Sequence, residues 1–296
     1  MSEIVCVAPT GDRCGEGPVW HAAENAVYWT DINRFLIHRF NPKNGSVKSW
    51  FFDEPVTALV LTDRADTLAV ALGSRVILWD PETDRRQDHT FRLDGWPHVR
   101  LNDGRADPRG SLWLGSMRNN VNADGSSGET GGTDGVLVRI DPDGSVTEWK
   151  RDIGIANTLA WSPDRTRFYF ADTAANVIWS YDYDARTGSI SGERPFLTNF
   201  SRGYPDGSNV DSEGYLWNCR YYGNCIVRVA PNGTVDQIIE MPTTNITSCT
   251  FGGDDLKTLY VTTASAGAPA SDRLAGSLFA IRTSVAGQPE NRFRIA

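Results

Sequence analysis

Six short segments of the sequence each begin with a side chain that can form hydrogen bonds, and four of these carry a carboxylate or a carboxamide. The six positions are Glu16, Thr57, Asn102, Asn157, Asp206 and Ser248. Carboxylate and amide oxygens are the ligands that hard divalent cations such as Ca²⁺, Mg²⁺ and Mn²⁺ prefer. If the fold brings Glu16, Asn102, Asn157 and Asp206 together, the two carboxylates would repel each other unless a cation lay between them. The alternative is that these polar groups cap strand ends and hold water.

Two further charged residues flank Asn102. Arg100 lies two residues earlier, on the same side of an extended strand, and Asp103 follows directly, so a regular strand would turn it the other way. A guanidinium beside amide and carboxylate groups suits a polyhydroxylated or anionic ligand. Arg100 could equally be the partner in a surface ion pair. No histidine joins this group, because the four histidines form no pattern such as HExxH.

The elements that must position these residues are short strands. Glycine (28) and proline (15) are spread through the chain, and no long segment has apolar residues at helical spacing. Pairs of apolar strands recur instead, such as Ala26–Thr30 with Ile37–Asn41, in six units of about 40–60 residues. The pattern predicts one all-β domain over residues 1–296, a six-bladed β-propeller with four-stranded blades. Residues 4–7 are predicted to pair with the last blade and close the ring. A β-sandwich or two domains are the alternatives.

Propeller geometry predicts where the polar residues lie. The first strand of each blade is innermost, so equivalent positions at its start should meet around the central channel at one depth. The loops between the second and third strands open at the same end. Two of them are long, Arg118–Asp134 and Ala264–Ser277, and we expect them to lie over the channel mouth as lids. Plain flexible insertions are the alternative.

Composition excludes several partners. Lys+Arg (29) against Asp+Glu (37) gives a net charge of −8, which argues against a nucleic-acid surface. No apolar run is long enough for a membrane span, and the N-terminus lacks a secretory signal. Five cysteines without a CxxC pair indicate free thiols in a reducing compartment, although Cys219 and Cys225 could also face each other across a hairpin. We therefore expect a cytoplasmic protein without membrane or nucleic-acid partners, and we favour a monomer.

The motifs together resemble the senescence marker protein/gluconolactonase family over nearly the whole chain and in the right order. The segments that carry the resemblance are Gly15–Trp20, Arg100–Arg105, Asn157–Asp164, Pro205–Gly207 and Phe251–Gly253. The resemblance implies a six-bladed propeller with one catalytic divalent metal.

By that resemblance, the metal ligands are Glu16, Asn157 and Asp206. Arg100, Asn102 and Asp103 match substrate-contacting residues, and Asn102 would contact the metal in the organophosphatase branch. The resemblance also implies that the most similar bacterial members hydrolyse aldonolactones. The chain departs from the animal members after Met117, where Arg118-Asn119-Asn120 replaces acidic residues, and this departure leaves the particular sugar open.

The resulting hypothesis is metal-assisted hydrolysis of a sugar (aldono)lactone, with one divalent cation (Ca, Zn, Mn, Mg or Fe(II)) polarising the carbonyl. Asp206 would also assist water attack, with Asp103 as the competing base, while Arg100 and Asn102 orient the sugar hydroxyls. A GxSxG elbow is absent, which agrees with a reaction that needs no covalent nucleophile. The alternatives are a phosphotriesterase-like hydrolase and a non-enzymatic, calcium-binding regulatory propeller.

Overall fold

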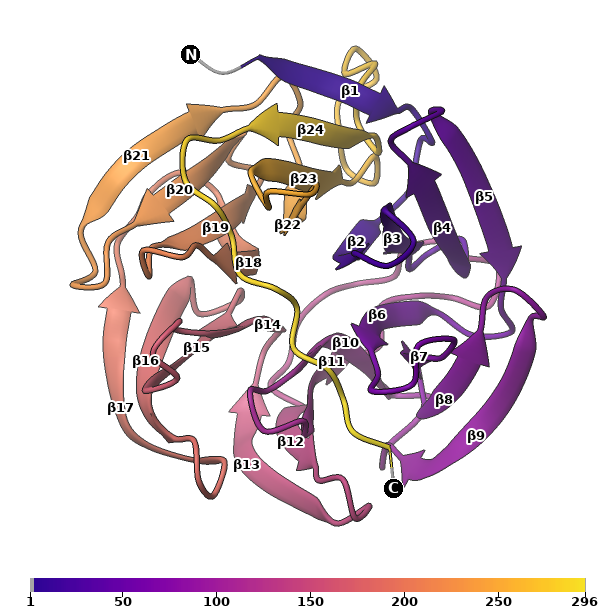
Figure 1. The fold of residues 1–296 in the computed structure, drawn as a ribbon, viewed down its shortest axis with the longest axis vertical. Helices are drawn as coiled ribbons and strands as arrows, with labels where there is room; N and C mark the ends of the chain where they lie inside the picture. Colours follow the sequence, from indigo (N-terminus) through magenta and orange to yellow (C-terminus); the bar gives the residue numbers. More distant parts are fainter. Residues whose placement is uncertain (1–2, 296) are drawn as a thin grey trace.

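The computed structural model describes residues 3–295, which form six four-stranded antiparallel sheets arranged radially in a ring (Figure 1). This confirms the six-bladed β-propeller. The ring is continuous, because the innermost strand of each blade contacts the innermost strands of both neighbouring blades. Within the described part of the chain there is no helix long and apolar enough to cross a membrane.

The strands follow the chain from the channel outward in each blade. Blade 1 contains β2 (Gly15–His21), β3 (Ala26–Asp31), β4 (Leu36–Asn41) and β5 (Ser46–Phe51). Blade 2 contains β6 (Val56–Leu61), β7 (Leu68–Leu72), β8 (Arg75–Asp80) and β9 (Arg85–Arg92). Blade 3 contains β10 (Val99–Ala106), β11 (Leu112–Arg118), β12 (Gly135–Ile140) and β13 (Val146–Ile153). Blade 4 contains β14 (Ala156–Trp161), β15 (Arg167–Asp172), β16 (Val177–Asp184) and β17 (Ser189–Leu197). Blade 5 contains β18 (Tyr204–Val210), β19 (Leu216–Tyr221), β20 (Cys225–Val229) and β21 (Val235–Glu240). Blade 6 contains β22 (Ile246–Gly252), β23 (Thr258–Thr263), β24 (Leu278–Arg282) and β1 (Ile4–Ala8).

The N-terminal strand closes the ring, as predicted. β1 is the outermost strand of blade 6 and runs antiparallel to β24, with Ile4 opposite Ile281 and Cys6 opposite Phe279. The first and last parts of the chain therefore share one sheet, and β24 has no open edge.

Burial explains why the strands occupy these places. Every residue of β6 is buried, whereas β21 is mostly exposed, because the inner strands lie between neighbouring sheets and the outer strands face water. Aromatic side chains fill the gaps between blades. The ring centroids of Trp113 and Phe168 lie 5.1 Å apart across blades 3 and 4, and those of Trp217 and Phe251 lie 5.5 Å apart across blades 5 and 6.

The cysteines contribute thiols to this packing. All five are free, and both Cys219 and Cys225 are buried. Across the β19–β20 hairpin, Cys219 faces Ile226 and Cys225 faces Arg220, so the two sulfurs are not opposite each other. Of the two interpretations of this pair, the structure favours buried thiols.

Each inner strand shifts its register close to its predicted polar position. The shifts in β2, β10, β14 and β18 follow Glu16, Leu101, Asn157 and Pro205, respectively. A bulge of this kind inserts a residue and redirects the side chains around it. The inner strands are therefore irregular where they line the channel mouth.

The C-terminal segment after β24 crosses the opposite end of the channel (Figure 1). It forms bridges between Gly287 and Asp211 and between Phe293 and Thr62, so it connects blades 5 and 2 across the axis. The sequence analysis assigned no role to this segment.

Candidate functional site

Two carboxyl groups from blades 1 and 5, which are separated by blade 6, meet at the channel mouth. Glu16 of β2 and Asp206 of β18 are both buried and lie close enough to shift each other's pKa. Asn157 of β14 is buried beside them, and its Nδ2 donates a 2.8 Å hydrogen bond to Thr173 Oγ1. The same Thr173 hydroxyl donates to the carbonyl oxygen of Pro205, directly before Asp206, at 2.7 Å. The structure thus brings the three predicted ligand residues into one hydrogen-bonded region.

Burial controls the charge of the two carboxyl groups. It raises the pKa of Glu16, and the nearby Asp103 carboxylate raises it further. Burial likewise raises the pKa of Asp206 well above its usual range, and the charge of Glu16 adds to the effect. The pair is therefore stable with a shared proton but unfavourable with two negative charges, unless a positive charge compensates them.

The donor atoms fit a hard divalent cation. Because Asn157 uses its Nδ2 on Thr173, its Oδ1 is the atom left to face the carboxyl groups, and this oxygen lies 3.5 Å from Asn102 Nδ2. Glu16, Asp206 and Asn157 together offer carboxylate and amide oxygens and no nitrogen or sulfur. Such a set suits Ca²⁺, Mg²⁺ or Mn²⁺.

Asp103 lies beside this pair because of the bulge in β10. In a regular strand Asp103 would point away from Asn102, but the register shifts between Leu101 and Gly104. The carboxylate Oδ1 accepts the N–H of Gly104 at 2.7 Å, and the backbone N–H groups of Thr158 and Leu159 lie near the side chain. Burial raises the pKa of Asp103, whereas the Arg105 guanidinium and these N–H donors lower it. Asp103 is thus a restrained acid next to Glu16 and Asp206.

Arg100 is buried, so the alternative of a surface ion-pair partner does not hold. Its Nη1 donates to Asn102 Oδ1 at 2.7 Å and to the Leu101 carbonyl oxygen at 2.9 Å. Its Nε and Nη2 donate to Asn120 Oδ1 at 3.2 and 2.7 Å. Asn102 in turn donates from Nδ2 to the carbonyl oxygen of Ala156 at 2.8 Å. Arg100 therefore fixes two amide side chains at the mouth.

Both long loops lie at the mouth end of the channel, as predicted. The segment between β11 and β12 extends from blade 3 to blade 1, where Asn33 Nδ2 donates to the Gly125 carbonyl oxygen at 3.0 Å. An ion pair between Arg118 Nε and Asp134, at 2.8 Å, joins the two ends of this segment. The segment between β23 and β24 receives a 3.1 Å hydrogen bond from the Tyr221 hydroxyl to the Ala266 carbonyl oxygen.

Two residues near the carboxyl groups escaped the sequence analysis. Cys14 lies beside the pair, and burial raises the pKa of its thiol, with the charges of Glu16 and Asp206 raising it further. Its position two residues before Glu16, on the same side of an extended segment, was the available signal. Asn120 is predicted only as a departure from the acidic residues of the animal sequences, whereas in the structure its Oδ1 accepts two hydrogen bonds from Arg100.

A second acidic cluster lies next to the site in blade 1. Ligand atoms of Asp12, Asp31 and His38 lie within 4.8 Å of one another, and all three residues are buried. Asp12 Oδ2 accepts the indole N–H of Trp29 at 2.7 Å, and His38 Nε2 lies 3.2 Å from Asp12 Oδ1. Asp31 accepts the backbone N–H of Cys14 at 3.2 Å. These contacts fix the segment that leads into Glu16.

A search against protein families agrees with this geometry. Residues 14–265 match the model of the SMP-30/gluconolactonase/LRE-like region. The chain belongs to this family. It is 36% identical to pentonolactonase XacC of Haloferax volcanii over 298 residues, covering 98% of this chain and 97% of the relative. It is 33% identical to a 6-deoxy-6-sulfogluconolactonase of Pseudomonas putida, covering 99% of both chains.

Solved structures of this family show the same architecture. The calcium-binding protein regucalcin from Agrobacterium tumefaciens superimposes with a TM-score of 0.90 at 29% identity, covering 98% of this chain and 97% of that one. A luciferin-regenerating enzyme gives a TM-score of 0.90 at 27% identity and covers both chains completely. The family assignment drawn from the motifs is therefore confirmed.

Proposed function

We propose that this chain is a sugar lactonase that hydrolyses an aldonolactone to its aldonic acid, with a divalent cation held by Glu16, Asn157 and Asp206. The observation that carries the proposal is the meeting of two buried carboxyl groups and an amide oxygen at the channel mouth. Two relatives that match nearly the whole chain are lactonases by name, and one of them acts on a pentonolactone. Their names support the lactone as the substrate class.

Hydrogen bonds within the protein orient the side chains of the proposed ligands Asn157 and Glu16. Thr173 orients the Asn157 amide, and the N–H of Gly17 donates to Glu16 Oε2 at 2.7 Å. Glu16 and Asp206 would exchange their shared proton for the cation. A bound divalent cation would supply Lewis-acid polarisation of the lactone carbonyl. The oxygen set accepts several ions, and Ca, Zn, Mn, Mg and Fe(II) all remain candidates.

The reaction needs a group that accepts a proton from water. As water adds to the carbonyl carbon, the bond from that carbon to the ring oxygen breaks, and the proton taken from water passes to the released oxygen. Asp206 or Asp103 can take this proton. Asp103 is not a member of the Glu16–Asp206 pair, and the Gly104 N–H holds its carboxylate in place. A general base typically contributes about 10²–10⁴-fold to the rate.

In this proposal, the amide side chains that Arg100 holds in place orient the substrate. Asn102 is half-buried at the mouth, with Arg100 behind it and the Ala156 carbonyl oxygen beside it. Its amide can exchange hydrogen bonds with sugar hydroxyls while Arg100 keeps it oriented. Losing Arg100 should therefore affect substrate binding more than the chemical step.

Chelation tests the metal requirement. Protein stripped with a chelator should lose activity on a panel of aldonolactones, and a panel of divalent cations should restore it to different degrees. Full activity in protein shown by elemental analysis to be metal-free would overturn the metal-assisted mechanism.

Substitutions test the individual roles. Asp206→Asn and Asp103→Asn should lower kcat, the true base by about 10²-fold or more, whereas Arg100→Ala should mainly raise KM. Asp66→Asn, an exposed acid on the β6–β7 turn, is the matched control. Metal titration separates the two acids, because only Asp206→Asn should also weaken cation binding. Equal effects of Asp206→Asn and Arg100→Ala on kcat would contradict these roles.

A calcium-binding protein without turnover is the second candidate. It is favoured by one observation, the 0.90 TM-score with a regucalcin described as calcium-binding. It predicts tight Ca²⁺ binding and no hydrolysis of any lactone in the same panel.

A further inference from the structure

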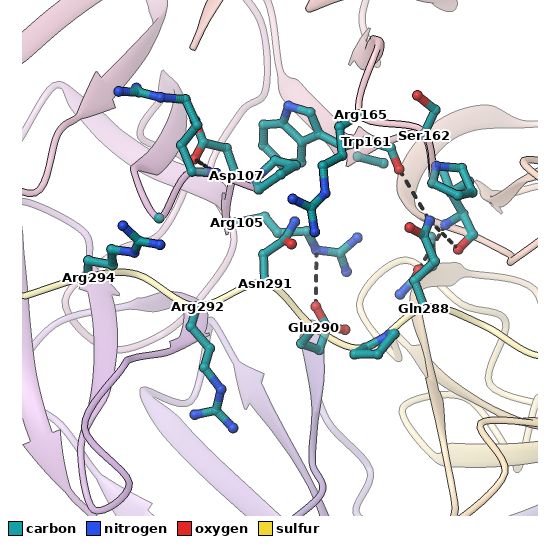
Figure 2. Close-up of a pocket in the computed structure, with 18 of the residues that line it drawn as sticks. Arg105, Asp107, Trp161, Ser162, Arg165, Gln288, Glu290, Asn291, Arg292 and Arg294 are labelled. Carbon is teal, nitrogen blue, oxygen red and sulfur yellow. Dashed lines mark hydrogen bonds and ion pairs between the residues drawn. The ribbon is translucent and has the colours of Figure 1, made fainter. Parts of the chain in front are cut away.

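A cavity of about 460 Å³ lies at the opposite end of the channel from Glu16 and Asp206 (Figure 2). It is formed where the C-terminal segment passes over the ends of β10, β14 and β18, beside Asp107, Trp161 and Val210. Its volume is within the range of roughly 300–1,000 Å³ that small-molecule sites occupy.

The cavity is positively charged although the protein is acidic. Five arginines line it against three carboxylates, whereas the whole chain carries a net charge of −8. The arginines are Arg105, Arg109, Arg165, Arg292 and Arg294. They come from blade 3, blade 4 and the C-terminal segment, so only the folded ring brings them together.

The three carboxylates are already engaged with the protein. Asp107 accepts the N–H groups of Ser111 at 2.9 Å and Trp113 Nε1 at 3.0 Å. Glu290 Oε1 accepts the Thr250 hydroxyl at 2.7 Å, while its other oxygen is 3.9 Å from Arg105 Nε. The Asp63 carboxylate accepts the Ile295 N–H at 3.2 Å. None of them makes a close, bidentate pair with a cavity arginine.

Three of the arginines keep most donors available, whereas Arg105 Nη1 donates to the Ser208 carbonyl oxygen at 2.9 Å and Arg109 Nη1 to the Thr187 carbonyl oxygen at 3.1 Å. Within residues 3–295, the guanidinium groups of Arg165 and Arg294 make no hydrogen bond or ion pair, and Arg292 donates only to the Thr62 carbonyl oxygen, at 2.8 Å. Figure 2 shows Arg165 and Arg105 extending into the cavity, with Arg292 and Arg294 along the C-terminal segment. Arginine donors arranged as planar forks match the oxygens of a phosphate or carboxylate group.

Amide oxygens provide a second, neutral set of contacts. Asn291 Nδ2 donates to the Ala106 carbonyl oxygen at 3.2 Å, and Gln288 Nε2 donates to the Val210 carbonyl oxygen at 3.1 Å. The Oδ1 of Asn291 and the Oε1 of Gln288 have no partner among the described residues. They can accept hydrogen bonds from hydroxyl groups.

The cavity is separate from the catalytic end. Between the two ends, Asp103, Gly104 and Glu290 line a second space of only about 10 Å³, which holds at most one water molecule. The cavity and the carboxyl pair are therefore two separate places in the channel.

We propose that this cavity binds a small phosphorylated sugar, with its phosphate on Arg165 and Arg105 and its hydroxyls on Asn291 and Gln288. A doubly charged phosphate monoester suits several unneutralised guanidinium groups better than a singly charged sugar acid does. The C-terminal segment is then a structural part of a ligand site as well as a cover for the channel.

Calorimetric titration of the full-length protein with glucose 6-phosphate, at constant ionic strength, tests this. We expect saturable binding with one site per chain, weaker binding of inorganic phosphate, and none of glucose. Arg165→Ala and Arg105→Ala should each weaken the affinity about tenfold or more. Arg151→Ala, which removes an exposed arginine on the outer strand β13 that does not line the cavity, should not change it.

Three results would overturn the proposal. One is the absence of saturable binding by the wild-type protein. Another is an equal loss in Arg151→Ala, which would indicate unspecific attraction. The third is gluconate binding as tightly as glucose 6-phosphate, which would indicate a sugar-acid site instead. Because titration requires no turnover, each result is independent of whether the protein hydrolyses lactones.

Discussion

Replacing Thr158 by valine tests how the site is held between blades 4 and 5. Thr158 follows the proposed ligand Asn157, is fully buried, and has a φ of 56°, a backbone conformation that β-branched residues rarely adopt. Its hydroxyl donates to the Asp206 carbonyl oxygen at 2.5 Å and lies 2.9 Å from Ser208 Oγ. Asn218 Nδ2 is also directed at it, at 3.4 Å. The Thr158 hydroxyl thus connects the backbone next to Asn157 with the backbone of Asp206.

The size of the effect follows from these contacts. Valine keeps the shape and the β-branch, so the backbone strain stays, but the hydroxyl contacts disappear. The Asp206 carbonyl oxygen keeps only the donor at Asn218 Nδ2, 3.2 Å away. Weakening a buried polar group in this way lowers the free energy of unfolding by about 1–3 kcal/mol. For a chain of this size, each kcal/mol corresponds to a Tm shift of about 2–4 °C. We expect the affinity for the cation to fall together with the free energy of unfolding.

Urea denaturation of metal-free protein measures the first effect, and titration with Mn²⁺ measures the second. Thr158→Ser is the control, because serine keeps the hydroxyl and loses only a methyl group, worth about 0.8 kcal/mol. We expect the serine variant to bind Mn²⁺ like the wild type. If valine behaves like the wild type and serine does not, the methyl packing maintains the site and the hydroxyl reasoning is wrong.

Three further predictions follow from the ring, the blade contacts and the buried acids. Deleting residues 4–8 should lower the Tm by several degrees, because β24 loses its outer partner strand and keeps only β23; an unchanged melting curve would contradict ring closure by β1. Gly115→Ala places a Cβ 2.4 Å from Ala156 Cβ and should lower the free energy of unfolding by about 1–3 kcal/mol, with Ala156→Gly as the compensating second change; non-additivity in the double mutant is the test. Because the folded metal-free protein binds more protons at Glu16 and Asp206 than the unfolded chain does, its stability should fall as the pH rises from about 5 to 8. Urea midpoints measured at several pH values check this. Saturating Mn²⁺ should make the stability less dependent on pH. A stability of the metal-free protein that rises with pH would contradict the prediction.

The repeat of the apolar pattern explains why the fold could be predicted. Each blade is a local meander whose strands follow one another in sequence, so six repeats of strand and turn determine six sheets. The same alignment predicted that Glu16, Asn157 and Asp206 would approach one another, because equivalent positions of inner strands lie at one depth. Ring closure followed from residues 4–7, the one apolar strand left without a partner in its own blade.

Features that depend on single insertions or on distant pairs could not be predicted. Nothing in the apolar pattern reveals the bulge that turns Asp103 toward the acids, because one extra residue leaves strand composition unchanged. His38 and Asp12 meet through backbone placement in blade 1, without a ligand motif. The cavity under the C-terminal segment requires Arg105, Arg165 and that segment, and the segment has no alternating pattern that would assign it to a strand.

The bulges in the inner strands determine which side chains reach the channel mouth. A regular strand presents alternate side chains to the channel, so six inner strands would offer one ring of six groups at each depth. The bulge in β10 places Asp103 as well as Asn102 at the mouth, and the positive φ at Gly17 and Thr158 redirects β2 and β14 next to Glu16 and Asn157. Such backbone conformations persist only where neighbouring contacts hold them, and at Thr158 those contacts come from blade 5. The site is therefore a property of the closed ring: separating blades 4 and 5 would release the strained backbone and, with it, the alignment of Asn157 and Asp206.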